Sequence, residues 1–148
     1  DEDGYAPNTC LSKLPDDNKI YSTTLADTKL AIANSDWGYI SITDPNLYLK
    51  TLVNTDFNYC KTKASIGDSV VLLGYPSYGS DYSNITATEG IISGYDGQYY
   101  TTSAKIEHGN SGGVAVQEKN NCYLGIPTGV ITGEFESLGR ILDVENIF

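Results

Sequence analysis

The sequence has no methionine, and it holds one histidine and one tryptophan in 148 residues. Basic residues are scarce: nine Lys and Arg face nineteen Asp and Glu, which gives a formal charge of −10. This charge argues against nucleic acid as a partner, because phosphates would be repelled. A single histidine with no Cys or His at ligand spacing argues against a zinc site, and we expect neither metal nor cofactor. No apolar run is long enough to span a membrane, so we expect no membrane span.

The residues that are abundant indicate a secreted or cell-surface protein. Tyrosine, Ser, Thr, Asn and Gly are frequent, Lys is rare, and Asn84-Ile85-Thr86 is a glycosylation sequon. The chain begins at Asp1 and shows no signal peptide, so we expect processing to have made this N-terminus. Acidic groups at Asp16-Asp17-Asn18 and Asp1-Glu2-Asp3 are interpreted as solvated turns rather than metal sites.

Short β-type segments separated by turn residues dominate the chain, which favours an all-β fold of the sandwich or barrel type. The predicted strands are Lys19–Thr23, Trp37–Ile42, Ser69–Leu73, Ile85–Ser93, Tyr99–Ser103, Val114–Gln117, Tyr123–Ile126 and Gly129–Thr132. Only Ala26–Ala33 and Leu138–Phe148 are predicted to carry helical turns. A change in composition near Cys60–Ile66 indicates a connection between two parts, residues 1–60 and 61–148.

The segment Glu107-His108-Gly109-Asn110-Ser111-Gly112-Gly113 carries the clearest chemistry. Glycine tolerates positive φ and lets backbone approach backbone, so this run predicts a tight turn. Such a turn presents the hydroxyl of Ser111 while the N–H groups of Gly109 and Ser111 point at one spot. That is the arrangement an oxyanion hole requires.

Four further blocks surround this turn in a recognisable order. They are Gly67-Asp68-Ser69-Val70 through Gly74-Tyr75-Pro76, then Thr88-Glu89-Gly90-Ile91-Ile92-Ser93, then Thr102-Ser103-Ala104-Lys105-Ile106, and lastly Leu124-Gly125-Ile126-Pro127-Thr128. Their order and spacing resemble the trypsin-like serine peptidases, specifically the bacterial HtrA-like branch. The resemblance is strong from Ile66 to Thr128. It implies a chymotrypsin-like double β-barrel whose first barrel is incomplete in this chain.

The resemblance also implies a role for each matching residue. Ser111 matches the nucleophile, and Gly109 and Ser111 match the oxyanion-hole donors. Thr102-Ser103-Ala104 and Gly125-Ile126-Pro127 match the two walls of the pocket for the substrate side chain. Ser103 stands where the family usually has Asp, and no charge is evident at the pocket. A small or modest apolar side chain is therefore expected there rather than a basic one.

The family's catalytic acid precedes a strand, and Asp36 followed by Trp37-Gly38-Tyr39-Ile40 matches that pattern. Asp36 would hold the imidazole tautomer and stabilise the imidazolium. Asp27 and Asp44 are weaker candidates, because one lacks a following strand and the other lies in a proline turn. Capping of a turn remains the alternative role of Asp36.

The base is the difficulty, since the family's chain order is His, Asp, Ser and no histidine precedes Asp36. His108 lies within the oxyanion turn, where a side chain is expected at the rim of the cleft rather than on the base side of Ser111. We expect an upstream fragment of the same precursor to supply the histidine.

The chain has three cysteines, an odd number. In the family the strands around Val70 and Val114 are antiparallel neighbours, and that register implies a Cys60–Cys122 disulfide. Cys10 would then pair with the upstream piece or remain a buried thiol.

These observations predict a serine endopeptidase that hydrolyses polypeptides through an acyl-enzyme, as the C-terminal portion of a processed precursor. The alternative is a non-catalytic peptidase-like domain, which would act as an assembly subunit on a cell surface or in an extracellular filament. A homo-oligomer is compatible with either prediction, since exposed strand edges invite a partner strand.

Overall fold

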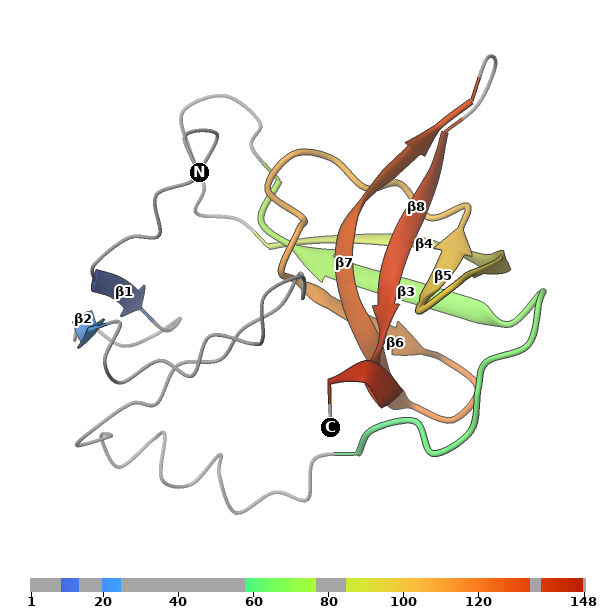
Figure 1. The fold of residues 1–148 in the computed structure, drawn as a ribbon, viewed down its shortest axis with the longest axis horizontal. Coiled ribbons are helices and arrows are strands. Elements are labelled where there is room, and N and C mark those ends of the chain that lie inside the picture. The colour runs from blue at the N-terminus through green and yellow to red at the C-terminus, as the bar shows by residue number, and fades with distance from the viewer. Residues whose placement is uncertain (1–8, 14–19, 25–57, 77–84, 134–136, 148) are drawn as a thin grey trace. The chain divides into compact units, whose positions relative to one another are not determined.

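The computed structural model describes residues 9–13, 20–24, 58–76, 85–133 and 137–147 (Figure 1). The chain divides into two compact units, Asp1–Asp56 and Phe57–Phe148, and the boundary predicted after residue 60 stays a prediction. The described part of the first unit is an antiparallel hairpin of β1 (Thr9–Lys13) and β2 (Ile20–Thr24). The predicted strand Trp37–Ile42 and helical turn Ala26–Ala33 lie outside the described residues.

The second unit is a closed antiparallel barrel with strand order β3-β4-β5-β8-β7-β6. Its strands are β3 (Ser69–Gly74), β4 (Thr86–Asp96), β5 (Tyr99–Thr102), β6 (Val114–Gln117), β7 (Cys122–Thr132) and β8 (Ser137–Asp143). Figure 1 shows β7 and β8 running side by side along one wall. A single 3-10 turn, η2 (Val144–Asn146), is the only helical element among the described residues. The predicted all-β, chymotrypsin-like barrel is confirmed.

The barrel closes around side chains that alternate along its strands. In β3, Val70 and Leu72 point inward and are 0% and 2% exposed. Val71 and Leu73, which alternate with them, are half-buried on the outside. Ile92 of β4 and Ile141 of β8 meet them in the core. The residues that face the core therefore follow the period of two of a β-strand.

One prediction of local structure was incomplete and another was wrong. Leu138–Phe148 was expected to carry a helical turn, and η2 at its end is one. The residues before it, 137–143, form β8, which pairs with β5 on one side and β7 on the other. The two short strands expected at Tyr123–Ile126 and Gly129–Thr132 are one strand, since β7 continues through a bulge between Pro127 and Gly129. Proline is tolerated next to a bulge because the residue there does not have to donate a backbone N–H to the neighbouring strand.

Candidate active site

The residues between Glu107 and β6 form the tight turn that their glycines predict. Gly109 and Gly112 have φ of 96° and 81°, the left-handed region that other residues avoid. The N–H of Asn110 donates to the Glu107 carbonyl at 3.0 Å, which closes the start of the turn. The backbone of Ser111 is thereby held between two residues whose conformations only glycine adopts without strain.

The backbone N–H groups of this turn fall into two sets. Those of residues 110, 112 and 113 donate to backbone carbonyls at 3.0, 2.9 and 3.0 Å. Those of Gly109 and Ser111 have no acceptor within the described part of the chain. These two are the donors that the resemblance implies for an oxyanion hole. The His108 N–H also has no acceptor within the described ranges, so the turn leaves the N–H groups of residues 108, 109 and 111 available. The resemblance names the last two of these as the donors for a ligand oxygen.

The hydroxyl of Ser111 is exposed, and its hydrogen is engaged by a backbone oxygen. Oγ donates to the carbonyl of Thr128 at 3.0 Å. Thr128 sits at the bulge of β7, and the N–H of Gly112 donates to the carbonyl of the adjacent Pro127 at 2.9 Å. The bulge therefore attaches the serine turn to β7 by two hydrogen bonds.

Ser111 lines two separate pockets. The first, which we call the Ile106 pocket, has a volume of about 280 Å³ and is lined by Ile106, Glu107, His108, Ser111, Thr128, Gly129 and Val130. The second, which we call the Val114 pocket, has a volume of about 290 Å³ and is lined by Leu73, Gly74, Tyr75, Ile85, Gly109, Ser111, Gly112, Gly113 and Val114. An extended ligand crossing the hydroxyl would therefore meet a pocket on each side of it.

One expected pocket wall is the segment Thr102-Ser103-Ala104. Its residues connect the end of β5 to β4 through hydrogen bonds. Thr102 is fully buried, and its hydroxyl donates to the Ile91 carbonyl at 2.8 Å. Ser103 Oγ accepts a hydrogen bond from the Ile91 N–H at 3.0 Å, and Ala104 is 2% exposed. None of the three lines the Ile106 pocket. They support the segment that leads into it.

Gly125-Ile126-Pro127, expected to be the other wall, lie in β7 beside the pocket. Gly125 and Pro127 are buried, and Ile126 is half-buried. The pocket is lined instead by the next three residues, Thr128-Gly129-Val130, together with Ile106 on the opposite side. Sequence reasoning did not assign these residues to the pocket, although Ile106 and Thr128 end two of the blocks it identified and Gly129 and Val130 follow directly.

Ile106 rests on a glycine of β8. A Cβ added to Gly139 would lie 2.7 Å from Ile106 Cδ1, so the isoleucine side chain occupies the space a side chain at 139 would need. Ile106 is half-buried and packs against the core. It therefore forms a fixed apolar floor for its pocket.

The carboxylate and the base expected beside Ser111 are outside the described site. Asp36 lies among the residues that the structure does not describe, as do Asp27 and Asp44. His108 lines the Ile106 pocket, but the hydroxyl of Ser111 donates to Thr128 rather than to this imidazole. The Ser111 hydroxyl is therefore not hydrogen-bonded to His108 as it would be to a general base.

Asn110 is the one residue of the turn that points inward. It is 3% exposed, and its Oδ1 has no hydrogen-bond donor among the described residues. A Cβ at Gly74 would lie 2.7 Å from this oxygen, so the amide packs directly on the β3 backbone. The side chain wedges the serine turn against the end of β3.

A disulfide between Cys60 and Cys122 is present, with the two Cα atoms 5.0 Å apart. It joins the segment before β3 to the start of β7, and both cysteines are 4% exposed. The isolated bridge between Tyr59 and Tyr123 runs alongside it. Cys10 lies in β1, and its side chain is outside the described part.

Tyr100 is a core residue of the barrel and is 1% exposed. Its hydroxyl accepts a hydrogen bond from the Ala64 N–H at 3.3 Å. Burial, reinforced by its hydrogen bond to the Asp143 carboxylate, raises the pKa of Tyr100 well above the ordinary tyrosine value. Burial also raises the pKa of Tyr123.

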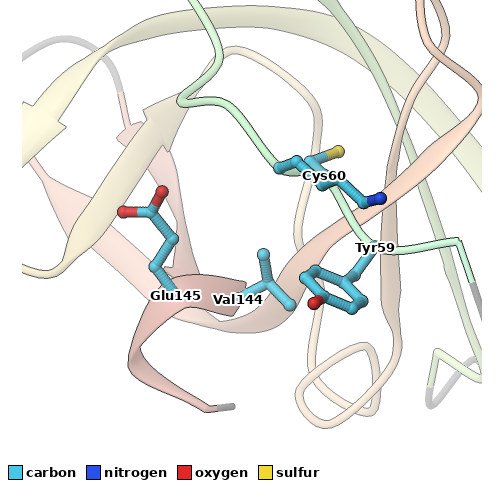
Figure 2. A pocket seen from close by; sticks show the side chains of 5 residues that line it. Tyr59, Cys60, Val144 and Glu145 are labelled. Atoms are coloured by element: carbon cyan, nitrogen blue, oxygen red, sulfur yellow. The ribbon is translucent and has the colours of Figure 1, made fainter.

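A third pocket, of about 370 Å³, shares no residue with the Ser111 pockets. Figure 2 shows Tyr59 and Cys60 facing Val144 and Glu145 of η2 across it, and Lys61 completes the lining. Among the described residues no group of His, Cys, Asp or Glu side chains gathers as metal ligands. No helix in the described ranges is long and apolar enough to cross a membrane.

Comparison with known proteins agrees with this geometry. No curated protein matches the chain. Two crystal structures of the Rv3671c protease share its fold. The inactive form is 22% identical, with a TM-score of 0.57 over 88% of this chain and 69% of that one. The active form, from M. tuberculosis, is 23% identical, with a TM-score of 0.59 over 88% and 60%.

The matched region of the sequence contains both the serine turn and Asp36. A family model described as a trypsin-like peptidase domain matches residues 3–126. This is most of the chain, and the matched range ends within β7. The chain belongs to the trypsin-like peptidase domain family.

Proposed function

We propose that this domain is a serine endopeptidase in which Ser111 attacks the scissile carbonyl and forms an acyl-enzyme. The observation that carries the proposal is the pair of unengaged N–H groups, Gly109 and Ser111, beside an exposed hydroxyl. As the carbonyl becomes tetrahedral its oxygen gains negative charge, and two fixed donors stabilise that charge without reorganisation. Water then hydrolyses the ester and regenerates the hydroxyl.

The general base in this proposal is a histidine from outside these 148 residues, held by Asp36. Two observations support it: His108 is the chain's single histidine, and the Ser111 hydroxyl is bound to Thr128 rather than to it. A base must reach Oγ at hydrogen-bond distance, so the incoming imidazole would draw the hydroxyl proton away from the Thr128 carbonyl. A processed upstream fragment of the same precursor is the source we propose, and secretion fits the disulfide.

Substrate would lie across Ser111 in extended form. The Ile106 pocket takes the side chain of the residue whose carbonyl is attacked, and its isoleucine floor suits an uncharged aliphatic group. Thr102-Ser103-Ala104 and Gly125-Ile126-Pro127 hold the two segments that carry the lining residues. Asp36, Ser111 and the donor pair complete the catalytic set.

A fluorophosphonate probe tests the proposal on the protein as isolated, with any associated polypeptide retained. We expect labelling of Ser111, located by mass spectrometry, and loss of labelling in Ser111→Ala. Ser69→Ala, a substitution at an exposed serine of β3, is the matched control and should label normally. Intact-mass analysis of the same sample should find a second, histidine-containing polypeptide. An unlabelled assembly would overturn the proposal and leave the non-catalytic assembly subunit as the function.

A further inference from the structure

The Val114 pocket shares only Ser111 with the Ile106 pocket. It is lined from the end of β3, whereas the Ile106 pocket is lined from β7, and these two strands pair with opposite edges of β6. Leu73 of β3 pairs directly with Val114 of β6. Gly74 pairs with Thr86 of β4, the residue after Ile85. The ends of three strands therefore bring these side chains to one place, beside the glycines of the serine turn.

These apolar side chains are exposed on the outside of the barrel and are not part of its core. Ile85 is 58% exposed, and Val114 and Tyr75 are 39% exposed each. Their neighbours Leu72 and Ala115 face inward and fill the core. Outward positions of a barrel strand are ordinarily polar, and clustered apolar groups on a surface mark a binding site.

The floor of the Val114 pocket is bare backbone. A Cβ at Gly113 would collide with the Leu73 carbonyl, and one at Gly74 would lie 2.7 Å from Asn110 Oδ1. Close packing thus requires glycine at both positions. The result is a recess walled by apolar side chains, and among the described residues no charged side chain lines it.

We propose that the Val114 pocket binds an apolar side chain on the leaving-group side of a peptide substrate, within the first two residues after the scissile bond. The inference rests on the proposed function. If the Ile106 pocket holds the side chain on the carbonyl side of the scissile bond, the chain beyond Ser111 must leave in the other direction. An extended peptide advances about 3.3 Å per residue, so its first side chains after the bond reach a pocket that Ser111 itself lines.

The chemistry of the recess selects the class of side chain. Its apolar wall would desolvate a charged group without offering it a partner, whereas an aliphatic or aromatic side chain gains by leaving water. The surrounding protein carries a formal charge of −10, which further disfavours acidic residues. The substrate class is therefore a polypeptide with apolar residues on both sides of the cleaved bond.

Partitioning of the acyl-enzyme between water and added amines tests the pocket separately from the first chemical step. A p-nitrophenyl ester of an acyl-leucine carries no amino-acid residue on the leaving-group side. The amplitude of its nitrophenol burst counts the acylated Ser111, whereas the burst rate also reflects the aromatic leaving group. An amino-acid amide then competes with water. Its nitrogen forms the new amide bond as the ester bond to Ser111 Oγ breaks, and its proton passes through the base to Oγ.

We expect leucine amide and phenylalanine amide to capture the acyl group at least about tenfold better than glycine amide or aspartate amide, since burying one apolar side chain contributes about 1.5–3 kcal/mol. Val114→Ser and Ile85→Ser should bring that preference close to one without changing the amplitude of the burst. Ile66→Ser is the matched control, because Ile66 is 63% exposed and lines neither pocket.

The possible failures are distinguishable. A normal burst without preference among the amines overturns the pocket assignment while leaving the proposed function intact. Absence of a burst overturns both. If sedimentation shows that the same two serine substitutions dissociate an oligomer, the recess is an interface between copies of this chain, and the assignment to substrate is wrong.

Discussion

Ser111 Oγ and the carbonyl of Thr128 are joined by a 3.0 Å hydrogen bond across 17 residues of sequence. The bond engages the hydroxyl proton that a general base would remove. It also shows which segment, the bulge of β7, positions the serine before a base is present.

Ser111→Ala should abolish acylation while leaving the fold nearly unchanged. The lost hydrogen bond is exposed, so we expect at most about 1 kcal/mol of destabilisation. The measurement is fluorophosphonate labelling together with urea unfolding. Loss of several kcal/mol would show instead that the Ser111–Thr128 bond is essential to the barrel, and the loss of labelling would then carry no information about catalysis.

Asn110→Asp should destabilise the domain at neutral pH and recover as the pH falls. A carboxylate at this buried site would lack a donor, so burial would raise its pKa above the value of about 3.9 in the unfolded chain. Its protonated form is then the stable one in the folded state, and stability declines as pH rises through the folded pKa.

Urea unfolding at pH 4.5 and 7.5 measures this difference, with Asn120→Asp at an exposed position as the control. We expect a loss of about 3 kcal/mol or more at pH 7.5 for Asn110→Asp. Equal behaviour of the two variants would mean that a donor reaches the 110 side chain.

Gly139→Ala should narrow the Ile106 pocket. The added methyl lies 2.7 Å from Ile106 Cδ1, so the isoleucine must move away from β8. We expect slower acylation by esters of leucine than by esters of alanine, relative to the parent protein. Ile106→Ala should have the opposite effect and admit larger acyl groups. Unchanged selectivity in both variants would exclude Ile106 as the floor.

Removal of the Cys60–Cys122 disulfide should destabilise the barrel by about 4 kcal/mol, because the bond closes a loop with a sequence separation of 62. Denaturant unfolding of Cys60→Ser/Cys122→Ser measures the cost. A reductant should lower the stability of the parent protein and leave the double variant unaffected. If it lowers both, Cys10 contributes a second bridge.

Alkaline pH should destabilise the folded barrel through Tyr100. Its pKa is raised in the folded state, so the unfolded chain loses the phenolic proton first, near pH 10. Stability is therefore fully present below about pH 10 and falls above it by up to 1.4 kcal/mol per pH unit for this group. Tyr100→Phe should reduce the slope of unfolding free energy against pH between 10 and 12. An unchanged slope would contradict the conclusion that folding raises the pKa of Tyr100.

Short β-type segments bounded by turn residues were a sufficient guide to β3 and β6, whose strands follow the predicted ranges closely. They did not identify β8, because Leu138–Phe148 was expected to carry only a helical turn, which η2 supplies at its end. Pairing with both β5 and β7 decides that segment in favour of a strand. Pro127-Thr128-Gly129 likewise looked like a break in β7, and the bulge that absorbs it depends on the neighbouring strand.

The oxyanion turn could be read from residues 107–113 alone, since glycine conformations and hydrogen bonds between near neighbours define it. The residues that surround Ser111 could not be predicted from the sequence in this way. Thr128, Ile106 and Val114 come from three separate segments, and only barrel closure sets which of them faces the hydroxyl. Local backbone preferences act over a few residues, whereas pockets arise from contacts between strands far apart in the chain.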